Sequence, residues 1–317
     1  MKKNKFYMLV VLAMLSTSCD KDDDNDGPNK MTFITQHTTV TMRLAGTGTA
    51  TIDWGDKSKT QTYSLREFEY ASFGPDQGFN HTYSGLSTHT ITITGENVTH
   101  LSFGNSLISH LDVSRNKMLE YLMCSFNPLT HLDVSKNTKL QSLFCSATQI
   151  TSFDVSNNAE LTVLSCGAID IVNLDVSKNT KLTYLECFRN PLLEYLDVSN
   201  NTNLQSLRCH DSQLRSLIVR GLANLEYLEC GSSITNPGHI SNHLTSLDVS
   251  GCSSLTYLKC ESNLLTADAL NDLFETLNDT MVSNGKDILI TNNPGTNDCD
   301  RRIAENKGWY VTDSTIE

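Results

Sequence analysis

The sequence predicts a mainly β chain: a coil of similar turns, preceded by a small β-sandwich and closed by an α/β segment. Three observations predict it. The nine residues LDVSKNTKL occur at 132–140 and again at 174–182, with looser copies nearby. Apolar and polar residues alternate with the strand period between residues 31 and 97. After residue 265 the repeat gives way to a helical spacing of apolar residues, followed by strand-like runs.

The first 18 residues have the pattern of an export signal. Three lysines precede an apolar run from Phe6 to Leu15, and small residues precede Cys19. The run is too short to span a bilayer, which favours a cleaved signal peptide at 1–18. Small residues before a cysteine resemble the lipobox of bacterial lipoproteins, and this resemblance implies lipidation of Cys19. An ordinary signal peptide with an incidental cysteine is the alternative.

Residues 19–30 are acidic and lack apolar side chains, which predicts a disordered tether. The stretch CDKDDD resembles the surface-export signal of Bacteroidetes lipoproteins. It implies a protein anchored by lipid in the outer membrane and exposed on the cell surface; a plain solvated spacer is the alternative. Acidic residues outnumber basic ones by 36 to 24, and removal of 1–18 lowers the net charge from −12 to −15. The absence of a basic stripe argues against a nucleic-acid partner.

Residues 31–97 predict a compact antiparallel sandwich of about six strands. The motifs IDWGD (52–56), HTYSG (81–85) and HTITITG (89–95) resemble the core motifs of PKD-type domains, which are immunoglobulin-like spacers. The resemblance implies that Trp54 packs in the core and that Asp53 and Asp56 bind turn amides, with calcium binding as the alternative. The stretch is short for that family, so either a strand is missing or a sheet is shared with the next segment.

Residues 98–265 repeat the unit LxxLxCxxNxLxxLDVSxNxx, mostly every 21 residues. Units begin at 98, 119, 140, 161, 182, 204, 225 and 255. This period and leucine spacing are typical of leucine-rich repeats, and the units resemble the nested 21-residue repeats of Bacteroidetes surface proteins. One unit cannot bury its own leucines, so stacked units are expected to share a core formed by positions 1, 4, 6, 11 and 14.

Position 6 of the unit places one residue in the core of every turn. The row reads Phe103, Cys124, Cys145, Cys166, Cys187, Cys209, Cys230 and Cys260. Parallel neighbours about 4.8 Å apart suit neither a disulfide nor a tetrahedral metal site, so we interpret these cysteines as small buried hydrophobes. Cys252 and Cys299 lie outside the row, and the sequence leaves open whether they pair.

The LDVS half of the unit repeats an aspartate. These are Asp112, Asp133, Asp154, Asp175, Asp197 and Asp248. Each has a serine two residues on and most have an asparagine four residues on, which favours hydrogen-bonded turns. Calcium binding is the alternative.

Residues 266–317 are predicted to cap the coil. TADALNDLFETLND has a capping threonine and helical apolar spacing, and two strand-like runs flank a second short helix. Without a cap the last turn would expose its leucines and an open sheet edge. The β domain is expected to protect the first turn in the same way.

Positions 3, 5 and 7 of each unit are expected to face the concave surface of the repeats. Aromatic residues are frequent there, which indicates a binding surface. The candidate ligand-binding residues are Tyr121, Met123, Phe144, Tyr184, Phe188, Tyr227 and Tyr257. Stabilisation of the sheet by paired side chains is the alternative. Later units alternate in charge at position 5, and these side chains are expected to attract one another: Glu186, Arg208, Glu229 and Lys259.

No phosphate loop, zinc-ligand spacing or catalytic constellation occurs in the sequence, so we expect neither an enzyme nor a bound cofactor or metal. The chain is predicted to be a surface-anchored binding or adhesion protein whose partner is an extracellular protein, for example one of a host. A glycan-binding accessory lipoprotein is the alternative. Contact with the membrane is expected only through the lipid anchor.

Overall fold

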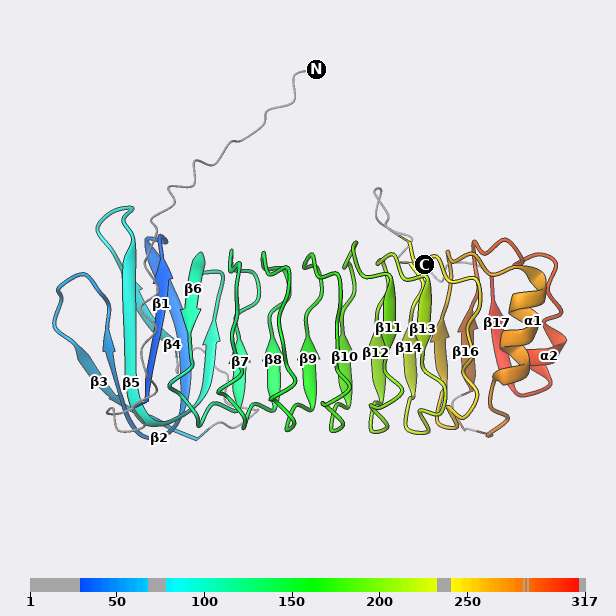
Figure 1. Cartoon of the computed structure of the whole chain (residues 1–317), viewed down its shortest axis with the longest axis horizontal. Coiled ribbons are helices and arrows are strands. Elements are labelled where there is room, and N and C mark those ends of the chain that lie inside the picture. Colours follow the sequence, from blue (N-terminus) through cyan, green and yellow to red (C-terminus); the bar gives the residue numbers. More distant parts are fainter. Residues whose placement is uncertain (1–28, 68–77, 233–240, 282, 284, 314–317) are drawn as a thin grey trace, which may run out of the picture.

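The computed structural model describes residues 29–67, 78–232, 241–281, 283 and 285–313. In this part of the chain, strands stack into one long coil, with the N-terminal strands at one end and two helices at the other (Figure 1). The predicted architecture, a mainly β solenoid that ends in an α/β segment, is confirmed. The export signal, Cys19 and nearly all of the expected tether lie outside the described residues.

The N-terminal domain and the repeats share a strand. Its elements are β1 (Lys30–Thr35), β2 (Thr39–Asp53), β3 (Gln61–Ser64), β4 (Gly78–Thr82) and β5 (His89–Phe103). The first half of β5 pairs with β1 and β2. Its second half pairs in parallel with β7 (Tyr121–Met123), where Leu101 lies opposite Leu122. One hydrogen-bonded sheet therefore crosses residue 97, and this sharing is one of the two outcomes that the short domain predicted.

Trp54 and the two neighbouring aspartates take the places that the PKD-like motifs imply. Trp54 is 1% exposed, and its ring stacks on His81 with 4.7 Å between centroids. Asp53 and Asp56 each accept a hydrogen bond, 2.9 Å long, from a backbone amide two residues further on. The second of these carboxylates also lies 2.8 Å from His81. Both aspartates therefore have turn-stabilising partners within the protein.

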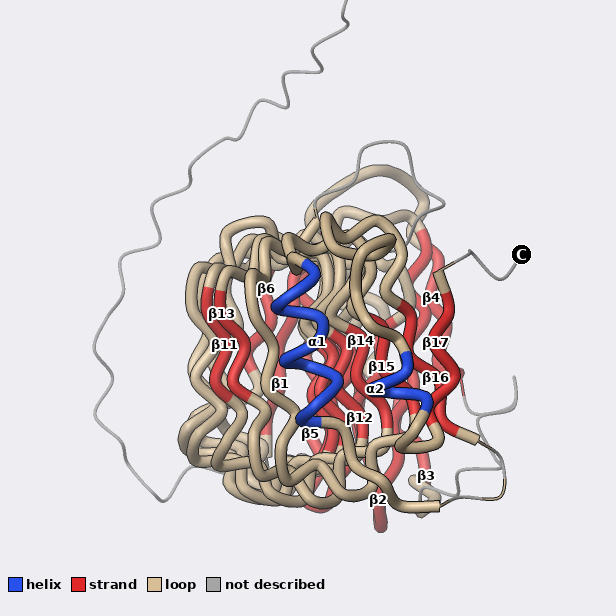
Figure 2. The backbone as a smooth tube through the Cα atoms, turned by 90° about the vertical axis from the view of Figure 1, so that its right-hand side faces the viewer, coloured by secondary structure: helices blue, strands red, loops and turns tan. Residues whose placement is uncertain are grey.

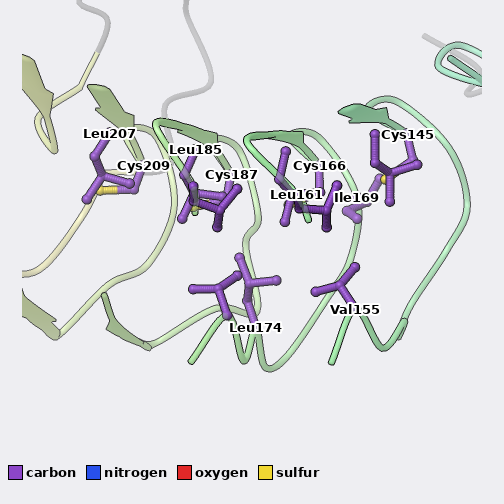
Figure 3. Packing of buried hydrophobic residues seen from close by; sticks show 14 of the residues in the cluster. Cys145, Val155, Leu161, Cys166, Ile169, Leu174, Leu185, Cys187, Leu207 and Cys209 are labelled. Carbon is purple, nitrogen blue, oxygen red and sulfur yellow. The ribbon is translucent and has the colours of Figure 1, made fainter. Parts of the chain in front are cut away.

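The repeats form a long parallel sheet on one side of the coil. It consists of β5, β7, β8 (Ser142–Phe144), β9 (Val163–Ser165), β10 (Tyr184–Glu186), β12 (Ser206–Arg208), β14 (Tyr227–Glu229) and β15 (Tyr257–Lys259). Equivalent residues of neighbouring units lie opposite one another throughout. The leucines between the outward residues are fully buried. Figure 3 shows two of them, Leu185 and Leu207, beside cysteines of the row. Each turn thus covers the leucines of the next.

The LDVS halves form the opposite side of the coil. The strands there are short: β6 (Ile108–Asp112), β11 (Tyr195–Asp197) and β13 (Ser216–Ile218). β11 and β13 pair with each other, and Figure 2 shows them across the coil from the long sheet. Each repeated aspartate accepts a hydrogen bond from the backbone amide of the serine two residues on. These bonds lower the pKa of Asp154 and Asp175 and confirm the turn interpretation.

Both ends of the coil are covered. At the C-terminal end lie α1 (Ala267–Thr276), β16 (Lys286–Leu289), α2 (Arg302–Glu305) and β17 (Trp309–Thr312). The Thr266 side chain caps α1 by accepting from the Ala269 amide, and the helix buries Leu270, Leu273 and Phe274. β16 and β17 continue the long sheet in parallel. At the other end β1 pairs with β6, and β2 pairs with the repeat half of β5.

Candidate binding site on the long sheet

The outer surface of the long sheet presents two rows of side chains, which we call the sheet face. Position 3 contributes Tyr121, Ser142, Val163, Tyr184, Ser206, Tyr227 and Tyr257, each opposite the next. Position 5 contributes the parallel row Met123, Phe144, Ser165, Glu186, Arg208, Glu229 and Lys259. Because strand residues alternate in direction, the leucine between the two rows points into the core.

An aromatic cluster occupies the N-terminal part of the sheet face. Tyr121 stacks on His100 with 5.5 Å between ring centroids, and it meets Phe144 at 5.4 Å. The Tyr121 hydroxyl lies 3.8 Å from the sulfur of Met123. Burial lowers the pKa of His100, so its imidazole is neutral at pH 7. The three candidate residues Tyr121, Met123 and Phe144 therefore lie side by side, as their positions in the unit predict.

Two further candidate tyrosines stack on each other. The rings of Tyr227 and Tyr257 are 4.9 Å apart and nearly parallel. The Tyr227 hydroxyl donates a hydrogen bond of 3.0 Å to Glu229, and burial together with this carboxylate raises the pKa of the hydroxyl. Stacking between neighbouring strands is the arrangement that the alternative interpretation, stabilisation of the sheet by paired side chains, also predicts.

Tyr184 differs from the other tyrosines of the row. It stands between the short side chains of Val163 and Ser206, and no ring stacks on it among the described residues. A hollow with a volume of about 610 Å³ opens between Tyr184 and Tyr121, over Ser142 and Val163. Three strand spacings separate the two tyrosines, about 14 Å. The hollow is therefore wide enough for an inserted side chain or a flat ring.

Phe188, the candidate at position 7, is packed within the protein. Its ring stacks on His210 with 4.9 Å between centroids and 4° between planes. It also covers Gly167, where a Cβ atom would come within 2.9 Å of the ring. Phe188 thus borders the sheet face but has partners on both sides.

The ion pairs of the charged row that lie within 4.0 Å join its later units. Glu229 lies 3.2 Å from Lys259 and 3.8 Å from Arg208, whose guanidinium lies over the Tyr227 ring at 5.3 Å. Glu186 forms no ion pair within 4.0 Å among the described residues. Its carboxylate instead accepts a 2.8 Å hydrogen bond from the hydroxyl of Ser165. The expected attraction is confirmed for Glu229 with its two cationic neighbours, and Glu186 is left at the edge of the hollow.

The cysteine row is buried, as its alternation with leucine predicts. All seven cysteines are 0% exposed and are free thiols. Burial raises the pKa of Cys145 and Cys187 to about 12, so these thiols stay protonated at neutral pH and are poor nucleophiles. Cys252 and Cys299 are free as well.

Two features of this surface could not be found from the repeat alone. The capping strands add Asp287 and Tyr310 to the position 3 row, and Tyr310 is 70% exposed. Glu261, at position 7, is only 5% exposed and lies against Gly231. Gly231 occupies position 7 of the preceding unit, and its lack of a side chain leaves the space that Glu261 fills. This glycine is the sequence signal that could have indicated the burial of Glu261.

Neither a metal-ligand cluster nor a membrane-spanning helix accompanies the sheet face among the described residues. The described residues include no group of three or more His, Cys, Asp or Glu side chains placed to hold a metal ion. Neither α1 nor α2 has the length and apolar character of a membrane span. The sheet face and its hollow are thus the features on which a function is best argued.

Comparison with solved structures finds repeat proteins of the same architecture. The functional domain of InlJ from Listeria monocytogenes, which includes a cysteine ladder, is 29% identical, with a TM-score of 0.50. The match covers 73% of this chain and 57% of that domain. The fold is a leucine-rich repeat solenoid. This solenoid also matches a leucine-rich repeat protein of Leptospira interrogans at 18% identity and TM-score 0.40, over 67% of this chain and 65% of that protein.

A third match is an internalin, InlF, from Listeria monocytogenes, at 18% identity and TM-score 0.29, over 68% of this chain and 82% of that protein. The matched region covers less than two thirds of the length of each of the first two structures, InlJ and the Leptospira protein. No protein-family model and no curated protein matches the chain.

Proposed function

We propose that this chain is a non-enzymatic binding protein of a bacterial cell surface, and that the sheet face holds a protein ligand. The observation that carries the proposal is the half-buried ring of Tyr184 at the edge of a hollow, on which no aromatic ring of the described residues stacks. Such a ring offers contact area at little cost in conformational entropy. An extended repeat sheet suits the broad contacts of protein–protein recognition.

Truncation of Tyr184 tests this role. Tyr184→Ala is expected to weaken ligand binding at least about tenfold, because central aromatic residues dominate interface energies. Thermal stability should change little, since no ring of the described residues stacks on Tyr184. Phe188→Ala should also weaken binding, but with a loss of stability, because its ring packs between Gly167 and His210. Titration of the captured ligand and thermal melts measure both quantities.

Asp154→Ala is the matched control on the other side of the coil. It removes a turn hydrogen bond to the Ser156 amide, so stability should fall while affinity is unchanged. If Tyr184→Ala only destabilises the protein and leaves affinity intact, the aromatic residues merely stabilise the sheet and the proposed function is wrong.

Glycan binding is the second candidate, because Tyr184 and Tyr121 flank a hollow in which a sugar ring could stack. Capture from a panel of extracellular proteins, run beside a glycan array, separates the two candidates. We expect a protein ligand that Tyr184→Ala loses. Binding to oligosaccharides alone would favour the glycan alternative.

We further propose that a lipid on Cys19 anchors the protein in the outer membrane, with the acidic residues that follow directing it to the cell surface. The basis is the sequence STSCDKDDD around this cysteine. Cys19→Ala should move the protein from the membrane fraction to the soluble fraction. Wild-type protein that carries no lipid would contradict the anchoring proposal.

A further inference from the structure

The hollow on the sheet face is lined by acidic and aromatic residues. Glu120 and Glu186 lie at its border together with Tyr121, Phe144 and Tyr184, and no lysine or arginine is among its lining residues. Neither glutamate forms an ion pair within 4.0 Å among the described residues. The lining therefore combines aromatic faces with negative charge, a combination that attracts cationic groups.

A hydroxyl chain fixes the direction of one of these carboxylates. The backbone amide of Gly167 donates to Ser146 at 2.9 Å, whose hydroxyl lies 2.8 Å from that of Ser165. Ser165 in turn donates to Glu186 at 2.8 Å. These bonds hold the Glu186 carboxylate toward β9, on the side of the hollow.

The strand that carries Tyr184 and Glu186 has a duplicate in the same sheet. Residues 184–186 and 227–229 both read Tyr-Leu-Glu. In the later copy, on β14, the preceding strand supplies Arg208, whose guanidinium lies over the Tyr227 ring at 5.3 Å and 3.8 Å from Glu229. The protein therefore shows, within its own sheet, which chemical group a Tyr-Leu-Glu strand accommodates.

On its β9 side, the earlier copy lacks this internal arginine. Ser165 occupies on β9 the place that Arg208 occupies on β12, because each lies opposite the glutamate of the following strand. Arg208 lies opposite Glu186 on the β12 side of β10, where its guanidinium interacts with Tyr184 and Glu186 as well as with Tyr227 and Glu229. The hollow lies on the β9 side of β10, and Arg208 is not among its lining residues. Because serine stands on β9 where arginine stands on β12, no long side chain of β9 fills the hollow beside β10.

We propose that this hollow receives an arginine side chain from the surface of the protein partner, with the guanidinium against Glu186 and its plane on Tyr184. The proposal rests on the function proposed above and names the chemistry of the contact. Arginine is favoured over lysine because its planar, delocalised cation both stacks on aromatic rings and binds carboxylates in a fork. The acidic balance of the chain, 36 acidic to 24 basic residues, complements a basic partner surface.

A pair of capped peptides tests the proposal. The probe is acetyl-Gly-Arg-Gly-amide, and its control carries citrulline, which keeps the shape and removes the charge. We expect the arginine peptide to bind the whole protein, to shift the NMR signals of Tyr184, and to bind at least about tenfold more tightly than the citrulline peptide. Glu186→Gln should abolish this difference, whereas Glu226→Gln, at an exposed position of a later unit, should preserve it.

Ser165→Arg provides a second variant that fills the hollow from within. It should recreate the arrangement of Arg208 and exclude the arginine peptide. Equal binding of the two peptides to the wild type, or undiminished discrimination in Glu186→Gln, would overturn the inference. Either result leaves the proposed function to be judged by the captured protein ligand. If Tyr184→Ala still loses that ligand, the proposed function stands and only the arginine contact is wrong. If the captured ligand is unaffected by Tyr184→Ala, the proposed function itself fails.

Discussion

Glu261→Gln should stabilise the protein at pH 8 by about 3 kcal/mol. Glu261 is 5% exposed, and its Oε2 atom makes no hydrogen bond among the described residues. Burial, together with the nearby carboxylates of Glu229 and Asp211, raises its pKa from 4.5 to about 7. The carboxyl group loses its proton more readily in the unfolded chain than in the folded one, because its pKa is higher in the folded state. The free energy of unfolding should therefore fall as pH rises from 4.5 through 7. Glutamine removes this loss because it does not ionise.

Chemical denaturation at pH 4.5 and at pH 8 measures the effect. The wild type and Glu261→Gln should be nearly equal at the lower pH and differ at the higher one. Glu226→Gln removes an exposed carboxylate and should leave stability nearly unchanged at both. Equal stability of the wild type and Glu261→Gln at pH 8 would show that the carboxylate is solvated.

Asn179→Ala should cost about 2 to 3 kcal/mol of folding stability. Asn179 is fully buried in the turn after LDVS, and its side-chain amide donates to the backbone oxygens of Val155 and Asn158 at 2.9 Å. Asn201 repeats these two bonds one unit later. Because each asparagine ties one turn of the coil to the turn before it, loss of one weakens an interface between units.

Lys178→Ala is the control, since the neighbouring lysine is exposed. It should change the free energy of unfolding by less than about 0.5 kcal/mol. Asn179→Asp should be worse than Asn179→Ala, because it loses the same donor and directs a carboxylate at carbonyl oxygens. Equal denaturation midpoints for Asn179→Ala and Lys178→Ala would contradict the structural role of the asparagine row.

The repeat period made most of the core and of the sheet face predictable. A strand alternates its side chains and the unit recurs every 21 residues, so Tyr184 and Glu186 must face outward while Leu185 and Cys187 face inward. The same argument placed Tyr121, Met123 and Phe144 together, and contacts among them confirm it. Short motifs were sufficient for the turns at Asp53 and Asp56 because the amides that donate to these carboxylates lie two residues further on in the same turn.

The repeat pattern could not predict where long side chains turn or how the backbone bends between strands. Arg208 lies opposite two glutamates, and only the structure shows that it joins Glu229. Position 8 adopts a left-handed backbone in several units, although Phe126 and Ala147 occupy it instead of glycine. Stacking of the turns imposes this conformation, and no residue preference signals it.

Photo-crosslinking tests most directly whether the captured ligand binds to the sheet face. A benzophenone amino acid would replace Tyr184 on the long sheet in one variant and Tyr195 in another. Tyr195 is 53% exposed on β11, on the opposite side of the coil, and so provides a matched position. With the captured ligand bound, we expect a crosslink from position 184 and none from position 195. A crosslink from position 195 alone would place the ligand on the other side and contradict the binding role of the sheet face.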